Sequence, residues 1–167
     1  MVDGFHIRPV TLDDVFVVAH HRASMFLDMG VLTPDLVDDL TKRTTVYLRD
    51  AVPKGEYVGW LAATAANRDR IVAGAGVQIR RVLPFPRQLA SDVVEVAHGR
   101  EAIVLNVYTE RAFRRLGLAR ALMQQVIAWA GSSDVDRLVL HAAPDGQSLY
   151  EALGFTPTTE MRYDRHD

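Results

Sequence analysis

Arg114-Arg115-Leu116-Gly117-Leu118-Ala119 is the stretch that decides the fold of this chain of 167 residues. It follows an apolar run, residues 102–109, that has the composition of a strand covered on both faces. It also opens a segment whose apolar residues recur at helical spacing as far as Gly131. A strand that turns through glycine into a helix leaves backbone N–H groups unpaired at the positive end of the helix. Such groups bind phosphate oxygens, so this stretch predicts a seat for a phosphorylated ligand.

Outward from this stretch, strands and helices alternate along the chain. Apolar alternation or short apolar runs predict strands at residues 5–10, 56–65, 71–80, 102–109, 135–141 and 155–163, the last interrupted at Pro157. Helical spacing and capping residues predict helices at residues 11–29, 33–47, 118–131 and 145–153. The polar turn at residues 66–70 makes the second and third strands a hairpin, and Pro84-Phe85-Pro86 starts an irregular loop that runs to about Gly99.

Composition and charge are those of an ordinary globular protein. Hydrophobic residues make up 49% of the chain and charged residues 24%, and the formal net charge is −2. This length favours a single domain, residues 1–167. The charge balance gives no overall attraction to nucleic acid or to an anionic membrane. The absence of cysteine excludes thiol nucleophiles, disulfides and thiolate metal ligands. No apolar run approaches the roughly 20 residues that span a bilayer, and the first residues lack an export pattern, so we expect a soluble, cytoplasmic protein.

Two motifs together carry a resemblance to a known family. The run Thr109-Glu110-Arg111-Ala112-Phe113-Arg114-Arg115-Leu116-Gly117-Leu118-Ala119 and the run Leu149-Tyr150-Glu151-Ala152-Leu153-Gly154-Phe155 resemble the two signature regions of the GNAT N-acetyltransferase superfamily. Tyr150 stands 33 residues after Gly117, with a predicted strand between them, and this pairing is far more specific than either motif alone. The resemblance implies an α/β fold with a mixed, mostly antiparallel central sheet, flanking helices and a splayed central strand pair.

The resemblance also implies acetyl-CoA as the acetyl donor. Backbone N–H groups of the bend would hold the CoA pyrophosphate, and Gly117 would let the chain approach it closely. The pantetheine arm would pair with the backbone at the end of the central strand. Many members carry an asparagine where this chain has Ala143, and Ser148 is a candidate substitute. The expected cofactor-binding residues are Val107, Tyr108, Thr109, Arg114, Arg115, Leu116, Gly117, Leu118, Ala119 and Ser148.

Proton transfer requires a donor to the departing thiolate and a base for the attacking amine. Tyr150 matches the family tyrosine that protonates the thiolate of CoA. Full transfer from tyrosine (pKa about 10) to a thiolate (about 8.5) is uphill by roughly 2 kcal/mol, so we expect Tyr150 to donate a hydrogen bond or to share the proton with water. Glu101, Glu110 and His141 are candidate bases, with a water relay as the alternative. The alternative is a solvated surface role for each glutamate and a hydrogen-bonded structural role for His141.

The acceptor side is less well defined by sequence. In the family the first two helices border the acceptor, so Arg22, Met25, Phe26 and Met29 are candidate substrate-binding residues, although their spacing also fits a core stripe. Asn106 would orient the substrate or a water molecule. An acidic acceptor would be attracted by Arg80, Arg81 and Arg87, unless these belong to a solvated loop. We predict no metal site, because the adjacent residues His20 and His21 point in different directions on a helix.

These observations predict an N-acetyltransferase that moves acetyl from acetyl-CoA to a primary amine by direct attack in a ternary complex. The amine would belong to a small metabolite, an antibiotic or a protein. The alternative is a CoA-binding sensor or interaction module without turnover. A phosphotransferase fits less well, because the bend lacks the lysine and hydroxyl pair of a P-loop. Relatives often form homodimers, whereas the sequence itself carries no signal for the oligomeric state.

Overall fold

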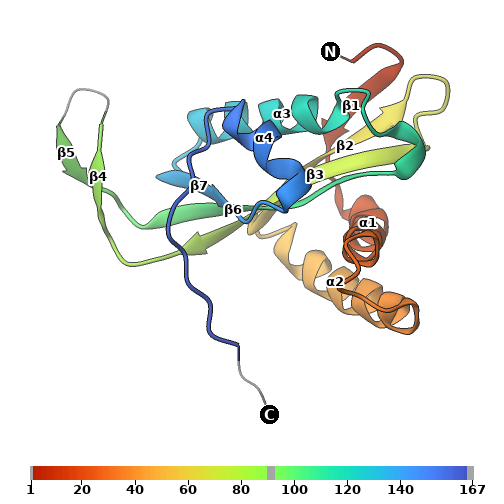
Figure 1. Ribbon diagram of the computed structural model, residues 1–167, viewed down its shortest axis with the longest axis horizontal. Helices are drawn as coiled ribbons and strands as arrows, with labels where there is room; N and C mark the ends of the chain where they lie inside the picture. The colour runs from red at the N-terminus through yellow and green to blue at the C-terminus, as the bar shows by residue number, and fades with distance from the viewer. Residues whose placement is uncertain (1, 90–92, 165–167) are drawn as a thin grey trace.

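A five-stranded sheet forms the centre of the molecule (Figure 1). The computed structural model describes residues 2–89 and 93–164. The strand order is β1-β2-β3-β6-β7, and every neighbouring pair is antiparallel except β6 and β7, which are parallel. The strands are β1 (Phe5–Pro9), β2 (Tyr57–Thr64), β3 (Ile71–Arg81), β6 (Arg100–Thr109) and β7 (Arg137–Leu140). This mixed, mostly antiparallel sheet confirms the predicted fold class.

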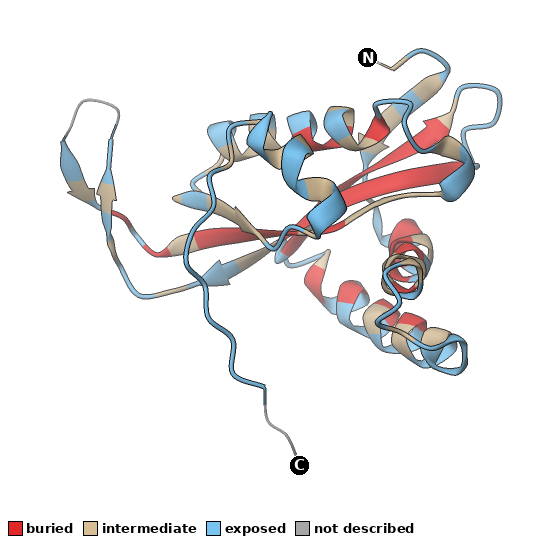
Figure 2. Ribbon diagram, in the orientation of Figure 1, coloured by how far each residue is buried: buried red, intermediate tan, exposed pale blue. Residues whose placement is uncertain are grey.

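Helices cover both faces of the sheet. On one face α1 (Val15–Asp28) and α2 (Val37–Ala51) bury a cluster that includes Val18, Leu48 and Leu61. On the other face, α3 (Leu118–Ser132) buries Leu122 and Val126 against β2, β3 and β6, and the short helix α4 (Gln147–Glu151) packs at its edge. Figure 2 shows the buried residues along the central strands and the inner faces of these helices. Short 3₁₀ turns precede each helix: η1 (Leu12–Asp14), η2 (Pro34–Leu36), η3 (Arg111–Phe113) and η4 (Pro144–Gly146).

The start of α1 is fixed by Asp14. Its carboxylate accepts hydrogen bonds from both Nη atoms of Arg8 (2.7 Å each) and from the backbone N and Oγ1 of Thr11 (2.8 Å each). The hydrogen bond from Arg8 is the largest influence, and the pKa of Asp14 falls to about 2. Thr11 is thus the N-cap of η1, the turn that leads into α1.

Strands β6 and β7 separate after a short contact. Only Glu101–Val104 of β6 pair with Arg137–Leu140 of β7, so β6 continues to Thr109 with no partner on that side among the described residues. At the point of separation β6 carries a bulge, because Leu105 lies opposite Gly76 and Tyr108 opposite Gly74. Asn106, within the bulge, has φ +58. The expected splayed strand pair is thus present, and it leaves a free backbone edge at residues 105–109.

Two predicted elements were wrong. The segment expected to be irregular between residues 84 and 99 contains β4 (Pro86–Gln88) and β5 (Val94–Val96), which form a second, antiparallel pair. The strand expected at residues 155–163 is absent: residues 155–164 are described without strand pairing. Pro157 has no N–H to donate to a sheet, and β7 offers only four residues to pair with.

Among residues 2–89 and 93–164, no helix is long and apolar enough to cross a bilayer.

Candidate active site

The bend before α3 has unpaired backbone donors. Arg115 (φ +66) and Gly117 (φ +83) both adopt the left-handed conformation, and Gly117 is the N-cap of α3 with no side-chain capping hydrogen bond. Within the described part of the chain, no backbone acceptor pairs with the N–H groups of Arg115, Leu116 or Gly117. The first N–H groups of a helix, here beginning at Leu118, have no partner within the helix either. These amides, together with the positive end of α3, are suited to binding an anion.

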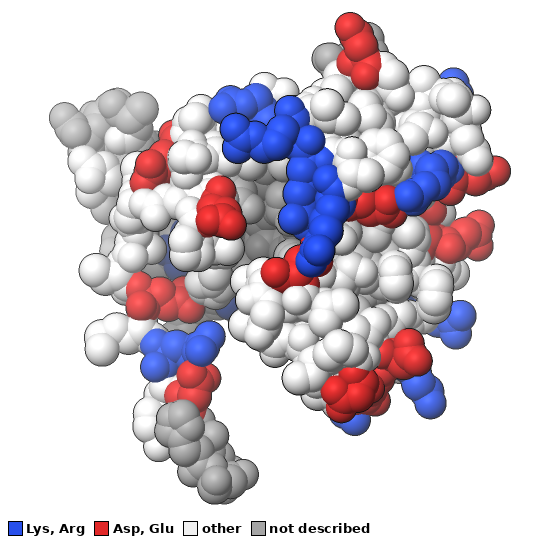
Figure 3. Space-filling model, turned by 45° about the vertical axis from the view of Figure 1, so that its right-hand side comes forward, with Lys and Arg blue, Asp and Glu red and all other residues white. Residues whose placement is uncertain are grey.

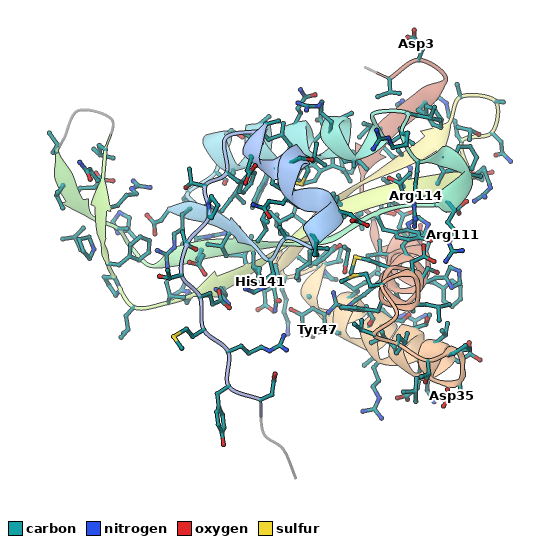
Figure 4. All side chains as sticks on the ribbon, in the orientation of Figure 1. Asp3, Asp35, Tyr47, Arg111, Arg114 and His141 are labelled. Carbon is teal, nitrogen blue, oxygen red and sulfur yellow. The ribbon has the colours of Figure 1, made fainter. Side chains whose placement is uncertain are left out.

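Arginines around this bend differ in how they are engaged. Arg114 donates from Nε to the carbonyl of Thr109 (3.0 Å) and from Nη2 to Asp28. Arg111 donates to the same carboxylate from Nε (2.9 Å) and Nη2 (2.6 Å), and hydrogen bonds from Arg111 are the main reason that the pKa of Asp28 lies below its usual value. Figure 4 shows Arg111 and Arg114 beside the end of α1. Arg115 and Arg120 bind no other described residue, so their guanidinium groups remain available to phosphate oxygens.

Basic side chains line the rim of a hollow on this side of the molecule. Figure 3 shows a continuous band of Lys and Arg side chains bordering the hollow. The predicted cofactor-binding segment Val107, Tyr108 and Thr109 lies on the free edge of β6 that begins at the splay, next to the bend. Ser148, the predicted substitute contact, is exposed on α4. The structure therefore brings a free strand edge and an anion site together, as an extended cofactor with a diphosphate requires.

Tyr150 lies on α4 and packs against the core cluster that includes Leu118 of α3. Its half-buried ring packs edge-on against Phe155, with 6.0 Å between the ring centroids. Burial raises the pKa of Tyr150, so the phenol stays protonated at neutral pH. Among the described residues its hydroxyl has no hydrogen-bond partner. A protonated hydroxyl with a free hydrogen is what donation to a thiolate needs.

Glu110 lies where β6 ends. Both of its carboxylate oxygens accept hydrogen bonds from Arg70, one at 2.7 Å, and its side chain is 26% exposed. The Nε2 of His21, on α1, is 3.9 Å from Oε1 of Glu110. The structure thus places this predicted base at the splayed end of β6, between the sheet and α1.

The other two predicted bases lie elsewhere. Glu101 is 1% exposed and accepts hydrogen bonds from Arg80 and Arg137. Burial raises its pKa, but the two guanidinium groups outweigh burial and leave the pKa below the usual value. His141, just after β7, is 60% exposed, and its Nε2 lies 2.7 Å from Oε1 of Glu160. Glu101 is therefore an ion-pair partner inside the sheet, and His141 is a surface residue joined to the C-terminal segment (Figure 4).

Arg22 and Asn106 are brought together on the α1 side. The Nη1 of Arg22 donates to Oδ1 of Asn106 (2.7 Å), and Nδ2 of Asn106 donates to the hydroxyl of Tyr57 (3.2 Å). Met25 and Phe26 are half-buried, Met29 is 49% exposed, and none of the three belongs to the core clusters. The predicted acceptor residues thus line an accessible wall of α1 rather than a core stripe.

The arginines expected to attract an acidic acceptor are placed differently. Arg80 is paired with Glu101, and Arg87 is paired with Glu95 and also donates to the carbonyl of Asp136 (2.7 Å). The exposed Arg81 lies at the end of β3. No group of histidine and acidic residues suited to a metal ion occurs in the described ranges.

Sequence reasoning missed three contributors to this site. Asp28 bridges two arginines that lie 83 and 86 positions further along the chain, and Tyr57 holds Asn106 across 49 positions. His21 is 3% exposed and contacts the ring of Tyr108, with 5.2 Å between the ring centroids. No local pattern marks any of them, because each acts through a partner distant in sequence.

Comparison with known proteins places this geometry in a family. The family model described as "Acetyltransferase (GNAT) family" matches residues 25–155. The chain is similar to a serotonin N-acetyltransferase 2, chloroplastic, of Oryza sativa subsp. japonica, with 30% identity over 138 residues. That match covers 82% of this chain and 60% of the rice protein, so the chain spans less than two thirds of this curated relative.

Solved structures agree with the family model. A GCN5-related N-acetyltransferase from Ralstonia eutropha JMP134 has 27% sequence identity and a TM-score of 0.81, over 97% of this chain and 99% of that one. A predicted acetyltransferase from Clostridium acetobutylicum, solved with acetyl-CoA, has 21% identity and a TM-score of 0.77, over 96% of each chain. At this identity the second likeness bears on the fold alone.

Proposed function

Because this chain belongs to the acetyltransferase (GNAT) family, we propose that it transfers the acetyl group of acetyl-CoA to a primary amine by direct attack in a ternary complex. One observation carries this proposal: the unpaired amides of the left-handed bend before α3 adjoin the free edge of β6. The bend binds the diphosphate, and the edge at Val107, Tyr108 and Thr109 pairs with the amides of the pantetheine arm. One domain, residues 1–167, carries both parts.

Tyr150 acts on the leaving group. When the amine attacks the thioester carbon, the C–S bond breaks and negative charge develops on sulfur. The hydroxyl of Tyr150 donates a hydrogen bond to that sulfur, because its raised pKa keeps it protonated and no other described residue occupies its hydrogen. A hydrogen bond to a charged group contributes about 1.5 to 3 kcal/mol. The sulfur is charged in the transition state and neutral in the thioester, so this hydrogen bond stabilises the transition state more.

Glu110 is the base that the geometry favours. The incoming ammonium must lose a proton before attack, and Glu110 is the predicted base that stands at the open end of β6 with part of its side chain exposed. The proton passes from the amine through water to the Glu110 carboxylate. Glu101 is less suited to this role because it is 1% exposed and held by two guanidinium groups, whereas Glu110 is 26% exposed and held by one such group, that of Arg70. His141 lies beyond β7 with Glu160 as its partner.

The acceptor is proposed as a small-molecule amine. The rice relative is a serotonin N-acetyltransferase, which supports an amine as the nucleophile without fixing its structure. The second candidate, a CoA-binding sensor without turnover, is favoured by Ala143, which offers no polar side chain at the N-cap of η4.

Two measurements test the proposal. Release of CoA thiol from acetyl-CoA is followed with a panel of amines, and CoA binding is measured separately by calorimetry. Binding accompanied by amine-dependent thiol release is the expected result. Binding with no release for any amine would favour the sensor, and absence of both would refute the cofactor assignment.

A further inference from the structure

Arg22 is a half-buried cation with no anionic partner. It lies on α1, facing the bulge of β6. Its contacts are the hydrogen bond to Oδ1 of Asn106 (2.7 Å) and the ring of Phe26, whose centroid is 4.8 Å from the guanidinium carbon. Within the described ranges, no carboxylate comes within 4.0 Å of it. Burial lowers the pKa of Arg22, which agrees with incomplete compensation of its charge.

Four other arginines around the sheet have acidic partners, unlike Arg22. Arg70 is paired with Glu110, Arg80 and Arg137 with Glu101, and Arg114 with Asp28. A guanidinium taken out of water is costly unless an anion accepts its hydrogen bonds. The neutral amide of Asn106 engages one of the five N–H donors that an arginine offers. The remaining donors of Arg22 are therefore without a protein partner where a counterion would be expected.

This guanidinium is also held in place and reachable. Asn106 is itself fixed by the hydroxyl of Tyr57 (3.2 Å) and by its position in the β6 bulge. The ring of Phe26 supports the other side of the group. None of the nitrogens of Arg22 is among the fully buried polar atoms that lack a partner, so the free donors are open to solvent. A fixed, accessible guanidinium can donate two parallel hydrogen bonds to a carboxylate or phosphate.

We propose that Arg22 binds an anionic group, a carboxylate or a phosphate, on the amine acceptor. This inference rests on the proposed function, because the acceptor amine must then lie near the splay of β6, next to Asn106. The half-buried guanidinium lies over the ring of Phe26, and an ion pair formed there is stronger than a pair in open water. A polycationic acceptor without an anionic group would be repelled by the same guanidinium.

The first test compares amines that differ in the anion. The pairs are β-alanine with β-alaninamide, and O-phosphoethanolamine with ethanolamine, which separate carboxylate from phosphate. We expect the protein to prefer at least one anionic member by about tenfold or more in kcat/KM, mainly through KM. Arg22→Gln should abolish that preference, so that kcat/KM falls about tenfold more for the anionic member than for its neutral partner. Arg22→Lys keeps the positive charge but loses the paired N–H donors of the guanidinium, so it should retain part of the preference for the anionic amine.

Arg49→Gln is the matched control, since Arg49 is an exposed arginine of α2 with no described partner. It loses the same charge and should leave the preference intact. An equal loss for anionic and neutral amines in Arg22→Gln would mean that Arg22 only positions Asn106, and it would overturn the inference. Equal use of both members of each pair by the unmodified protein would overturn it as well.

A binding measurement separates this inference from the proposed function. Calorimetry with the CoA-saturated protein follows the same four amines without requiring turnover. Arg22-dependent binding of an anionic amine with no acetylation would support the anion site and contradict the enzyme. Failure of both anionic amines to bind more tightly than their neutral partners would contradict the anion site, whatever the activity with other amines.

Discussion

Tyr150 gives the sharpest prediction at the scale of a single residue. Its hydroxyl is assigned to the departing sulfur, whereas its ring packs against Phe155. Tyr150→Phe keeps the ring and removes the hydroxyl, so we expect kcat to fall about 10- to 100-fold while the Kd of acetyl-CoA changes less than about threefold. Steady-state kinetics and calorimetry measure the two quantities. An unchanged kcat would remove the assigned role.

His21 gives a prediction of pH dependence. Burial lowers its pKa to about 4 against an ordinary value of 6.5, despite the nearby Glu110 carboxylate. Between these two values the unfolded chain binds a proton that the folded chain does not, so stability is full above pH 6.5 and falls as the pH drops toward 4. The loss amounts to about 3 kcal/mol.

Urea unfolding of the wild type and of His21→Gln across this pH range measures the effect. The variant lacks the group whose protonation destabilises the folded wild type, so its free energy of unfolding should fall less between pH 6.5 and 4. The difference in free energy of unfolding between the two proteins should therefore narrow as the pH falls. Parallel curves for the two proteins would show that His21 titrates normally in the folded state.

Candidate site residues are named most directly where a local motif carries them. The bend residues and Tyr150 belong to contiguous motifs, and their roles remain predictions. The candidates for the base were not separable by sequence, because the partners that distinguish them are distant. Arg80 and Arg137, on neighbouring strands, form ion pairs with Glu101, and no sequence spacing predicts these pairs.

At the scale of the element, the start of α3 is the feature to test. Gly117 has φ +83, and nothing lies within 4 Å of a Cβ built there. An alanine there would therefore be strained by its backbone conformation, by about 1 to 2 kcal/mol, and it would turn the amides away from the diphosphate. We expect Gly117→Ala to weaken CoA binding about tenfold or more, as measured by calorimetry.

Gly131 provides the matched control in the same helix. It lies near the end of α3 with an ordinary φ and open space around its Cβ position. Gly131→Ala should raise the free energy of unfolding by about 0.5 to 1 kcal/mol and leave CoA affinity unchanged. Equal effects of the two substitutions on CoA affinity would count against the bend as the binding site.

Element prediction succeeded where periodicity was strong and failed where pairing was decided at long range. The helices α1, α2 and α3 and the strands β2, β3 and β6 follow from apolar spacing and capping residues. The expected strand at residues 155–163 has a suitable composition, but a strand needs an edge to pair with, and Pro157 with the short β7 removes that option. Prolines at residues 84 and 86 are typical of irregular structure, but a proline is tolerated as the first residue of a strand, and Pro86 begins β4 opposite Val96 of β5.

At the scale of the whole molecule, the proposed donor and acceptor residues lie on opposite sides of the sheet. The α3 and α4 side carries the bend and Tyr150, and the α1 side carries Arg22 and the other proposed acceptor residues. The splay of β6 and β7 joins the two sides, because the sheet is open there. We therefore expect a donor bound at the bend and an acceptor bound beside α1 to meet at the splay.

The structure of the complex with CoA tests the central claim most directly. Diphosphate oxygens should accept hydrogen bonds, at about 2.7 to 3.2 Å, from backbone amides between Arg115 and Ala119, with the pantetheine arm along residues 107–109 of β6. A diphosphate bound at any other place, with the amides of the bend left unpaired, would contradict the account.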